Sequence, residues 1–229
     1  MSLIQTELNE KMRSILVDWL VDVHIKFKLQ PETLFLAVNL IDRYLSQNIA
    51  SKQKLQLLGI TCMFIAAKYE EIYPPPVKDF AYVTDRAYTT KEILEMEGKV
   101  LSSLTFKLTF ASAFRFLERY HLIAQLDEKG YNLARYLLEL SLVEYKLQKY
   151  SPSVLACSAI YLANKLTKRE LWSKDLFRNT KYDENDLKSC AKELLILFQN
   201  APKSSLKAVN RKFSTTKYFE VAKLQSDLY

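Results

Sequence analysis

Glycine is scarce in this chain, with three residues among 229, and proline is infrequent, with six. Sandwiches and barrels made of β-strands need many tight turns, which depend on these residue types, so their scarcity argues against a β fold. A phosphate-binding loop of closely spaced glycines is also missing from the sequence. Leucine, lysine and glutamate are abundant, and apolar residues recur at helical spacing. We therefore expect an all-α fold.

Residues that commonly carry catalysis or bind metals are few. The two histidines, His24 and His121, have no serine or cysteine beside them in a nucleophile pattern. The three cysteines are far apart and form no C-x-x-C pair, which argues against a zinc or dithiol site and suits a reducing compartment. We expect no catalytic residue, no metal, no cofactor, and an intracellular protein that is not an enzyme.

The formal net charge is +7. A basic balance can indicate a nucleic acid, an acidic membrane or an acidic protein as partner. Here the lysines are scattered over helix faces rather than grouped in blocks, which favours an ordinary solvated surface.

One stretch, Leu55 to Glu71, is apolar at nearly every helical position. Its small residues, Gly59 among them, let neighbouring helices come close. A helix that is apolar on all sides is buried, and this one is shorter than the roughly 20 apolar residues of a membrane span. We expect a central core helix that ends before Tyr73-Pro74-Pro75-Pro76 and presents Lys68 at the surface.

The helix expected from about Asn9 to Lys28 carries two apolar stripes. One stripe contains Met12, Ile15, Leu16 and Trp19, and the second contains Val17, Val21 and Ile25. One core cannot cover both stripes, so the helix is either packed on two sides or partly exposed for a partner. Further helices are expected after Pro31, from Lys78 to Tyr82, and from Thr89, which forms a capping box with Glu92.

An internal repeat runs through the chain at a constant offset of 97 residues. Thr61 recurs as Ser158, Lys68 as Lys165, and Leu40-Ile41-Asp42 as Leu137-Leu138-Glu139. Matches at one offset over three helices predict two copies of a five-helix unit. We expect these copies at residues 1–107 and 108–202, followed at 203–229 by a basic tail that could hold a short helix.

Several motifs resemble the cyclin family. They are Met12 to Val21 (MRSILVDWLV), Ile41 to Leu45 (IDRYL), Leu55 to Gly59 (LQLLG), Lys68 to Pro75 (KYEEIYPP), Met96-Glu97 and Leu104-Thr105-Phe106. The KYEEIYPP run is very similar to that of A- and B-type cyclins, and together the motifs cover nearly the whole chain. The resemblance implies two tandem five-helix cyclin boxes, in agreement with the internal repeat.

The motifs divide between A-type and B-type patterns. Met63 to Ala66 resembles B-type cyclins, whereas Val17 and Phe106 to Leu108 resemble A-type cyclins. Ser14 stands where alanine is usual, and Asp22 stands where A-type cyclins have glutamate. We expect a mitotic A/B-type cyclin, with the B type slightly favoured.

The resemblance implies a non-catalytic regulatory subunit that binds and activates a cyclin-dependent serine/threonine kinase in cell-cycle control, in the nucleus and cytoplasm. Lys68 and Glu97 would hydrogen-bond main-chain groups around the mobile C-helix of the kinase. Apolar contacts around them would come from Ile72, Leu101 and Phe106.

The resemblance also implies a docking groove for substrates or inhibitors that contain an Arg-x-Leu motif, lined by Met12, Ile15, Leu16, Trp19, Asp22, Leu55 and Gln56. An apolar cleft would take the leucine, Asp22 would face the basic residue, and Gln56 would bond the peptide backbone. For Ile15 and Leu16 an ordinary core position is the alternative. Arg13 and Asp42 would form a structural ion pair between the first two helices.

Two other functions remain as alternatives. Transcription factors of the TFIIB kind also contain two cyclin-like repeats but bind DNA. Only the +7 charge favours this alternative function. A helical scaffold without a kinase is the third reading. Because the motifs match kinase activators, we expect neither a nucleic acid nor a membrane as partner.

Overall fold

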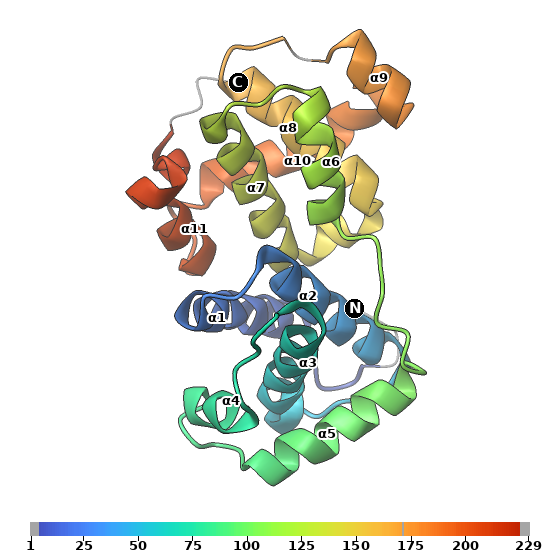
Figure 1. Cartoon of the computed structure of the whole chain (residues 1–229), viewed down its shortest axis with the longest axis vertical. Coiled ribbons are helices and arrows are strands. Elements are labelled where there is room, and N and C mark those ends of the chain that lie inside the picture. Colours follow the sequence, from blue (N-terminus) through green and yellow to red (C-terminus); the bar gives the residue numbers. More distant parts are fainter. Residues whose placement is uncertain (1–4, 171, 225–229) are drawn as a thin grey trace. The chain divides into compact units, whose positions relative to one another are not determined.

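The computed structural model describes residues 5–170 and 172–224, which form helices and connecting loops without any β-strand (Figure 1). The all-α class predicted from the sequence is confirmed. The chain divides into two compact units between Phe110 and Ala111.

The first unit is built around one buried helix. Its elements are α1 (Glu10–Phe27), α2 (Pro31–Gln47), the 3-10 helix η1 (Lys52–Lys54), α3 (Leu55–Glu70), α4 (Val77–Val83) and α5 (Thr90–Ser103). Twelve of the 16 residues of α3 are buried, and α3 contacts each of the other four α-helices (Figure 1). A helix apolar on every side is stable only in this central position.

Side chains cap the helices of this unit. Asn9 accepts a hydrogen bond from the amide of Met12 at the start of α1, at 2.9 Å. At the start of α5, Thr89 and Glu92 form the predicted capping box. The residue before α2 offers no side-chain cap, and the carboxylate of Glu71 serves instead, accepting from the amide of Gln30 at 2.7 Å. The end of α3 is thereby fixed against the start of α2.

An ion pair joins α1 to α2. Arg13 donates from Nε and Nη2 to the two carboxylate oxygens of Asp42, at 2.6 and 2.7 Å. The Arg13 side chain is only 2% exposed, and that of Asp42 is 22% exposed. Bidentate geometry of this kind gives direction as well as attraction, so the pair fixes the orientation of the two helices.

The second unit repeats the helical order of the first. Its elements are α6 (Ala113–Ile123), α7 (Glu128–Val143), η2 (Tyr145–Lys149), α8 (Pro152–Leu166), α9 (Lys174–Thr180), α10 (Glu184–Asn200), α11 (Ala208–Phe213), η3 (Thr216–Tyr218) and η4 (Val221–Lys223). Helices α7, α8 and α9 begin 97 residues after α2, α3 and α4 begin. The offset found in the sequence is therefore also the offset between the helices.

The segment after Pro202 packs on α7 of the same unit. Lys212 of α11 donates to both carboxylate oxygens of Glu139, at 2.7 and 2.6 Å, and Arg135 lies 3.3 Å from the same carboxylate. Glu139 occupies the repeat position of Asp42. Each unit thus has an acidic residue here, but the basic residue that reaches it from another helix comes from α1 in the first unit and from α11 in the second.

No helix in the described ranges is long and apolar enough to cross a membrane. Within the same ranges, no group of three or more histidine, cysteine or acidic side chains is arranged to hold a metal ion.

Candidate functional site

Lys68 and Glu97 lie together in the first unit, where Lys68 is exposed and Glu97 is largely buried. Lys68 is in the last turn of α3, Glu97 is on α5, and their charged atoms Nζ and Oε1 are 2.5 Å apart. The Lys68 side chain is 43% exposed, and its Nζ lies 4.3 Å from the centroid of the Phe64 ring. A cation in the last turn of a helix also interacts favourably with the helix dipole.

Exposed or partly exposed apolar side chains follow Lys68 and Glu97 along the chain. Ile72, four residues after Lys68, is 88% exposed. Leu101 lies one turn beyond Glu97 on α5 and is partly exposed. Phe106 is 69% exposed, and its amide donates to the carbonyl of Leu101 at 2.9 Å. Large exposed apolar side chains around a few polar groups are typical of a protein-binding surface.

The backbone that carries Phe106 has an unusual conformation. Thr105 and Phe106 have φ values of 50° and 56°, in the left-handed region that a β-branched residue such as threonine rarely adopts. The hydroxyl of Tyr69, on α3, lies 2.6 Å from the Thr109 hydroxyl and ties this segment to α3. Strained backbone of this kind often occurs at binding sites.

The second unit lacks the charge pair. The repeat position of Lys68 is Lys165, which is also exposed near the end of its helix. The repeat position of Glu97 is Leu194, which is completely buried. The combination of lysine and glutamate is therefore a property of the first unit.

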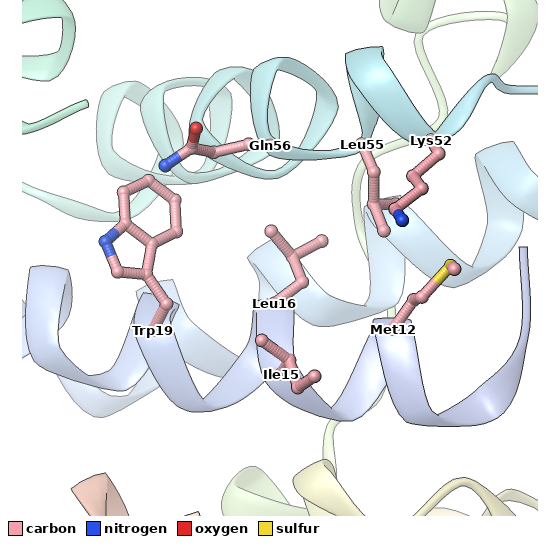
Figure 2. A pocket seen from close by; sticks show the side chains of 7 residues that line it. All are labelled: Met12, Ile15, Leu16, Trp19, Lys52, Leu55 and Gln56. Carbon is pink, nitrogen blue, oxygen red and sulfur yellow. The ribbon is translucent and has the colours of Figure 1, made fainter. Parts of the chain in front are cut away.

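A groove of about 410 Å³ lies between α1 and the start of α3 (Figure 2). It is lined by Met12, Ile15, Leu16, Trp19, Lys52, Leu55 and Gln56. Six of these seven residues are among those predicted for docking. Ile15 is 50% exposed, whereas Leu16 and Leu55 are 5% and 7% exposed and form the floor. The floor residues thus belong to the core and to the groove at once.

The depth of the groove depends on Gly59. A Cβ atom at this position would lie 2.6 Å from Cδ1 of Leu16. Because glycine has no side chain, α1 and α3 approach closely here and Leu16 can lie low against α3. This contact explains why a glycine is found inside a helix that would otherwise be more stable with alanine.

Two charged residues differ from the prediction in their placement. Asp22 lies on α1 three residues beyond Trp19 and is partly exposed, but it is outside the set that lines the groove. Lys52 does line the groove, and the sequence interpretation missed it. The available signal was its position three residues before Leu55, which places both on one face of a helical turn.

The cysteines offer no nucleophile. Cys62, Cys157 and Cys190 are free and buried. Burial raises the pKa of Cys157 to about 12 and that of Cys190 to about 11, and it also raises the pKa of Cys62. At neutral pH all three are therefore protonated thiols, which are the unreactive form.

Comparison with known families matches the cyclin N-terminal domain to residues 1–109 and the cyclin C-terminal domain to residues 111–227. The class of protein is thus a tandem cyclin-fold protein, and the chain belongs to the cyclin family.

Similar relatives include cyclins of the A type and of the B type. The chain is 42% identical to Cyclin-B2-1 of Oryza sativa subsp. japonica, over 98% of this chain and 54% of the relative. It is 43% identical to G2/mitotic-specific cyclin-B of Dictyostelium discoideum, over 95% and 50%. It is 46% identical to Cyclin-A1-1 of Oryza sativa subsp. japonica, over 97% and 45%. The A/B-type assignment is confirmed, these identities do not decide between A and B, and the chain spans about half the length of these relatives.

Solved structures share the fold at low sequence identity. A viral cyclin from herpesvirus saimiri matches with a TM-score of 0.76 at 22% identity, covering 86% of this chain and 90% of the viral chain. A chain of the yeast RNA Pol II CTD kinase CTDK-1 complex matches with a TM-score of 0.72 at 16% identity, covering 96% and 71%.

Proposed function

We propose that this chain is a regulatory cyclin subunit that binds and activates a cyclin-dependent serine/threonine kinase in mitotic control. The observation that carries the proposal is the Lys68–Glu97 pair with exposed apolar residues beside it. A surface that binds a partner through main-chain groups needs both donors and acceptors. Lys68 supplies three N–H donors and Glu97 supplies carboxylate acceptors.

In the proposed complex the pair opens toward the kinase. Each charged group exchanges part of its present pairing for main-chain groups around the kinase C-helix, while Ile72, Leu101 and Phe106 lose contact with water. Burying such apolar side chains contributes about 25 cal/mol per Å² of area. The apolar residues therefore supply affinity, and the charge pair fixes how the C-helix of the kinase is aligned on the cyclin surface.

Activation is then conformational. The kinase contains its own catalytic groups, including a lysine–glutamate pair that assembles when the C-helix moves inward. A partner that binds the inward position more tightly shifts the kinase toward it. The cyclin chain itself transfers no phosphate.

The test is a titration of kinase with wild type and with a Lys68→Ala/Glu97→Ala variant. Removing charges that become buried in a complex costs about 2–5 kcal/mol, so affinity should fall at least thirtyfold. The matched control is Lys165→Ala with Glu95→Ala, which removes the repeat-position lysine and an exposed glutamate of α5. Equal affinity of the double variant and its control would refute the assignment.

We further propose that the groove between α1 and α3 docks Arg-x-Leu peptides of substrates or inhibitors. The leucine enters over Leu16 and Leu55, Gln56 bonds the peptide backbone, and Asp22 faces the arginine. Docking raises the effective concentration of the substrate at the kinase.

Trp19→Ala tests the docking groove, since a large aromatic residue is a frequent energetic centre of an interface. A labelled Arg-x-Leu peptide should bind wild type but not this variant, whose fold is checked by circular dichroism. Kinase activation should persist, because Trp19 lies outside the Lys68–Glu97 surface. A folded variant that binds the peptide as well as wild type does would exclude the groove.

We propose action in the nucleus and cytoplasm without a nucleic-acid partner. Residues 1–110 contain 13 basic and 13 acidic residues, whereas residues 111–229 contain 20 and 13, so the +7 charge belongs to the second unit. A DNA-gripping protein of the TFIIB kind would use this unit and would lose affinity steeply with added salt. We expect no specific change in the electrophoretic mobility of DNA when the chain is added at physiological salt.

A further inference from the structure

The groove has a basic residue at one end. Trp19 and Gln56 lie at one end, and Met12 and Lys52 lie at the other, with Leu16 between them (Figure 2). The side chain of Lys52 ends beside that of Leu55 (Figure 2). The groove is therefore apolar along its floor and positively charged at the end opposite Trp19.

Local structure places Lys52 there. It is the first residue of η1, and the amide of Leu55 donates to its carbonyl, so this turn leads directly into α3. The amide of Lys52 itself donates to Glu7 Oε2 at 3.2 Å. The turn is thus held from both sides, and the aliphatic stem of Lys52 forms part of the groove wall while its ammonium group stays in contact with water.

The ammonium group of Lys52 is available. Among the described residues no ion pair is found for it, and the carboxylate of Glu7 accepts a hydrogen bond from the amide of Lys52. The neighbouring Lys54 is outside the set of residues that line the groove. The pKa of Glu92 is held below its usual value by hydrogen bonds from Thr89 and, to a lesser extent, by the charge of Lys54. Lys52 is therefore the lysine of η1 that serves the groove.

We propose that Lys52 pairs with an anionic side chain, a carboxylate or a phosphate, that follows the leucine of a docked Arg-x-Leu peptide. This inference rests on the docking function proposed above and adds a charge requirement to it. If the arginine lies toward Asp22, beyond Trp19, and the leucine lies over the floor, the residues after the leucine run toward Lys52. The groove then selects peptides that are basic before the leucine and acidic after it.

The expected preference follows from the exposure of the lysine. Ion pairs at a protein surface contribute about 0.2–1 kcal/mol, which corresponds to a preference of about 1.4- to fivefold. A phosphate carries close to two charges and more acceptor oxygens, so phosphoserine should give a larger preference, about tenfold. A lysine in place of the acid should weaken binding through like-charge repulsion.

The experiment uses the full chain and Arg-x-Leu peptides that carry Glu, Gln, Lys or phosphoserine at each of the three positions after the leucine. Wild type should bind the Glu peptide more tightly than the Gln peptide at one of these positions. In Lys52→Glu the order should reverse, with the Lys peptide bound most tightly. The matched control, Lys54→Glu, makes the same charge change two residues away and should keep the wild-type order.

The outcomes separate this inference from the docking proposal. Equal binding of all peptides to wild type, with binding still lost in Trp19→Ala, would leave the groove in place and overturn the role of Lys52. If Lys54→Glu also lost the preference for acidic peptides, the preference would come from the overall positive charge of η1 rather than from an ion pair with Lys52. That result would also overturn the role of Lys52. No binding of any peptide would overturn both. A stronger effect of phosphoserine than of Glu would identify the preferred anion as phosphate.

Discussion

Asp42→Ala is expected to lower the free energy of unfolding of the first unit by about 3 kcal/mol. The substitution removes the two carboxylate oxygens of Asp42 to which Arg13 donates, and the Arg13 side chain, which is 2% exposed, cannot turn to water without opening the packing of α1 on α2. Deleting one partner of a buried pair typically costs about 3–5 kcal/mol. Asp42 is itself 22% exposed, so water already screens the pair and the lower end of this range applies.

The assay is denaturant unfolding followed by tryptophan fluorescence. The chain has two tryptophans, and a Trp172→Phe background leaves Trp19 on α1 as the reporter of the first unit. The control is Glu95→Ala, which removes a carboxylate that is 57% exposed and 4.0 Å from Lys91. An exposed pair contributes about 0–1 kcal/mol, so the control should barely move the transition.

A second variant separates the contribution of the ion pair to stability from that of side-chain packing. Asp42→Ala combined with Arg13→Met removes both charges of this pair and leaves neither one unpaired, so part of the lost stability should return. If Asp42→Ala unfolds at the same denaturant concentration as Glu95→Ala, the pair has no structural role and the reasoning is wrong.

Three further outcomes are expected. Gly59→Ala should push Leu16 into the groove, lower stability by about 1 kcal/mol and weaken peptide binding. The control is Gly98→Ala, because a Cβ atom there meets nothing within 4 Å. It should stabilise α5 by about 0.5–1 kcal/mol and leave peptide binding unchanged. Glu139→Gln should destabilise the second unit by about 3 kcal/mol, since Lys212 stays buried without its carboxylate, and limited proteolysis should then cut residues 203–224 faster. Burial raises the pKa of the three thiols above 9, so unfolding at high pH releases their protons. The free energy of unfolding should therefore fall above pH 9 by up to about 1.4 kcal/mol per pH unit per thiol. Replacing all three cysteines by alanine should flatten this decline in denaturant titrations.

The helices could be predicted because their signals are local. The apolar run from Leu55 predicted a central helix to Glu71, and α3 ends one residue earlier, at Glu70. The prolines after it and the capping box at Thr89 define boundaries through backbone chemistry that depends on neighbouring residues alone. The offset of 97 residues needs only the sequence to be compared with itself.

Contacts between distant segments could not be predicted in the same way. The region from residue 203 looked like a polar tail, yet Lys212 is buried against Glu139, 73 residues earlier in the chain. Helical periodicity does not report which basic residue will pair with a buried acid. The position of Lys52 was only partly predictable: its spacing of three residues from Leu55 places both on one face of a helical turn, but that spacing does not report that this face lines a groove with α1.

Phosphate transfer by a purified cyclin-dependent kinase, measured while this chain is added, tests the central claim most directly. We predict that the chain alone transfers no phosphate and that wild type raises the kinase rate to a plateau. The Lys68→Ala/Glu97→Ala variant should need at least thirtyfold more protein for the same rate. If wild type raises the rate of none of the cyclin-dependent kinases of the source cell, or if chain free of kinase transfers phosphate, the account is contradicted.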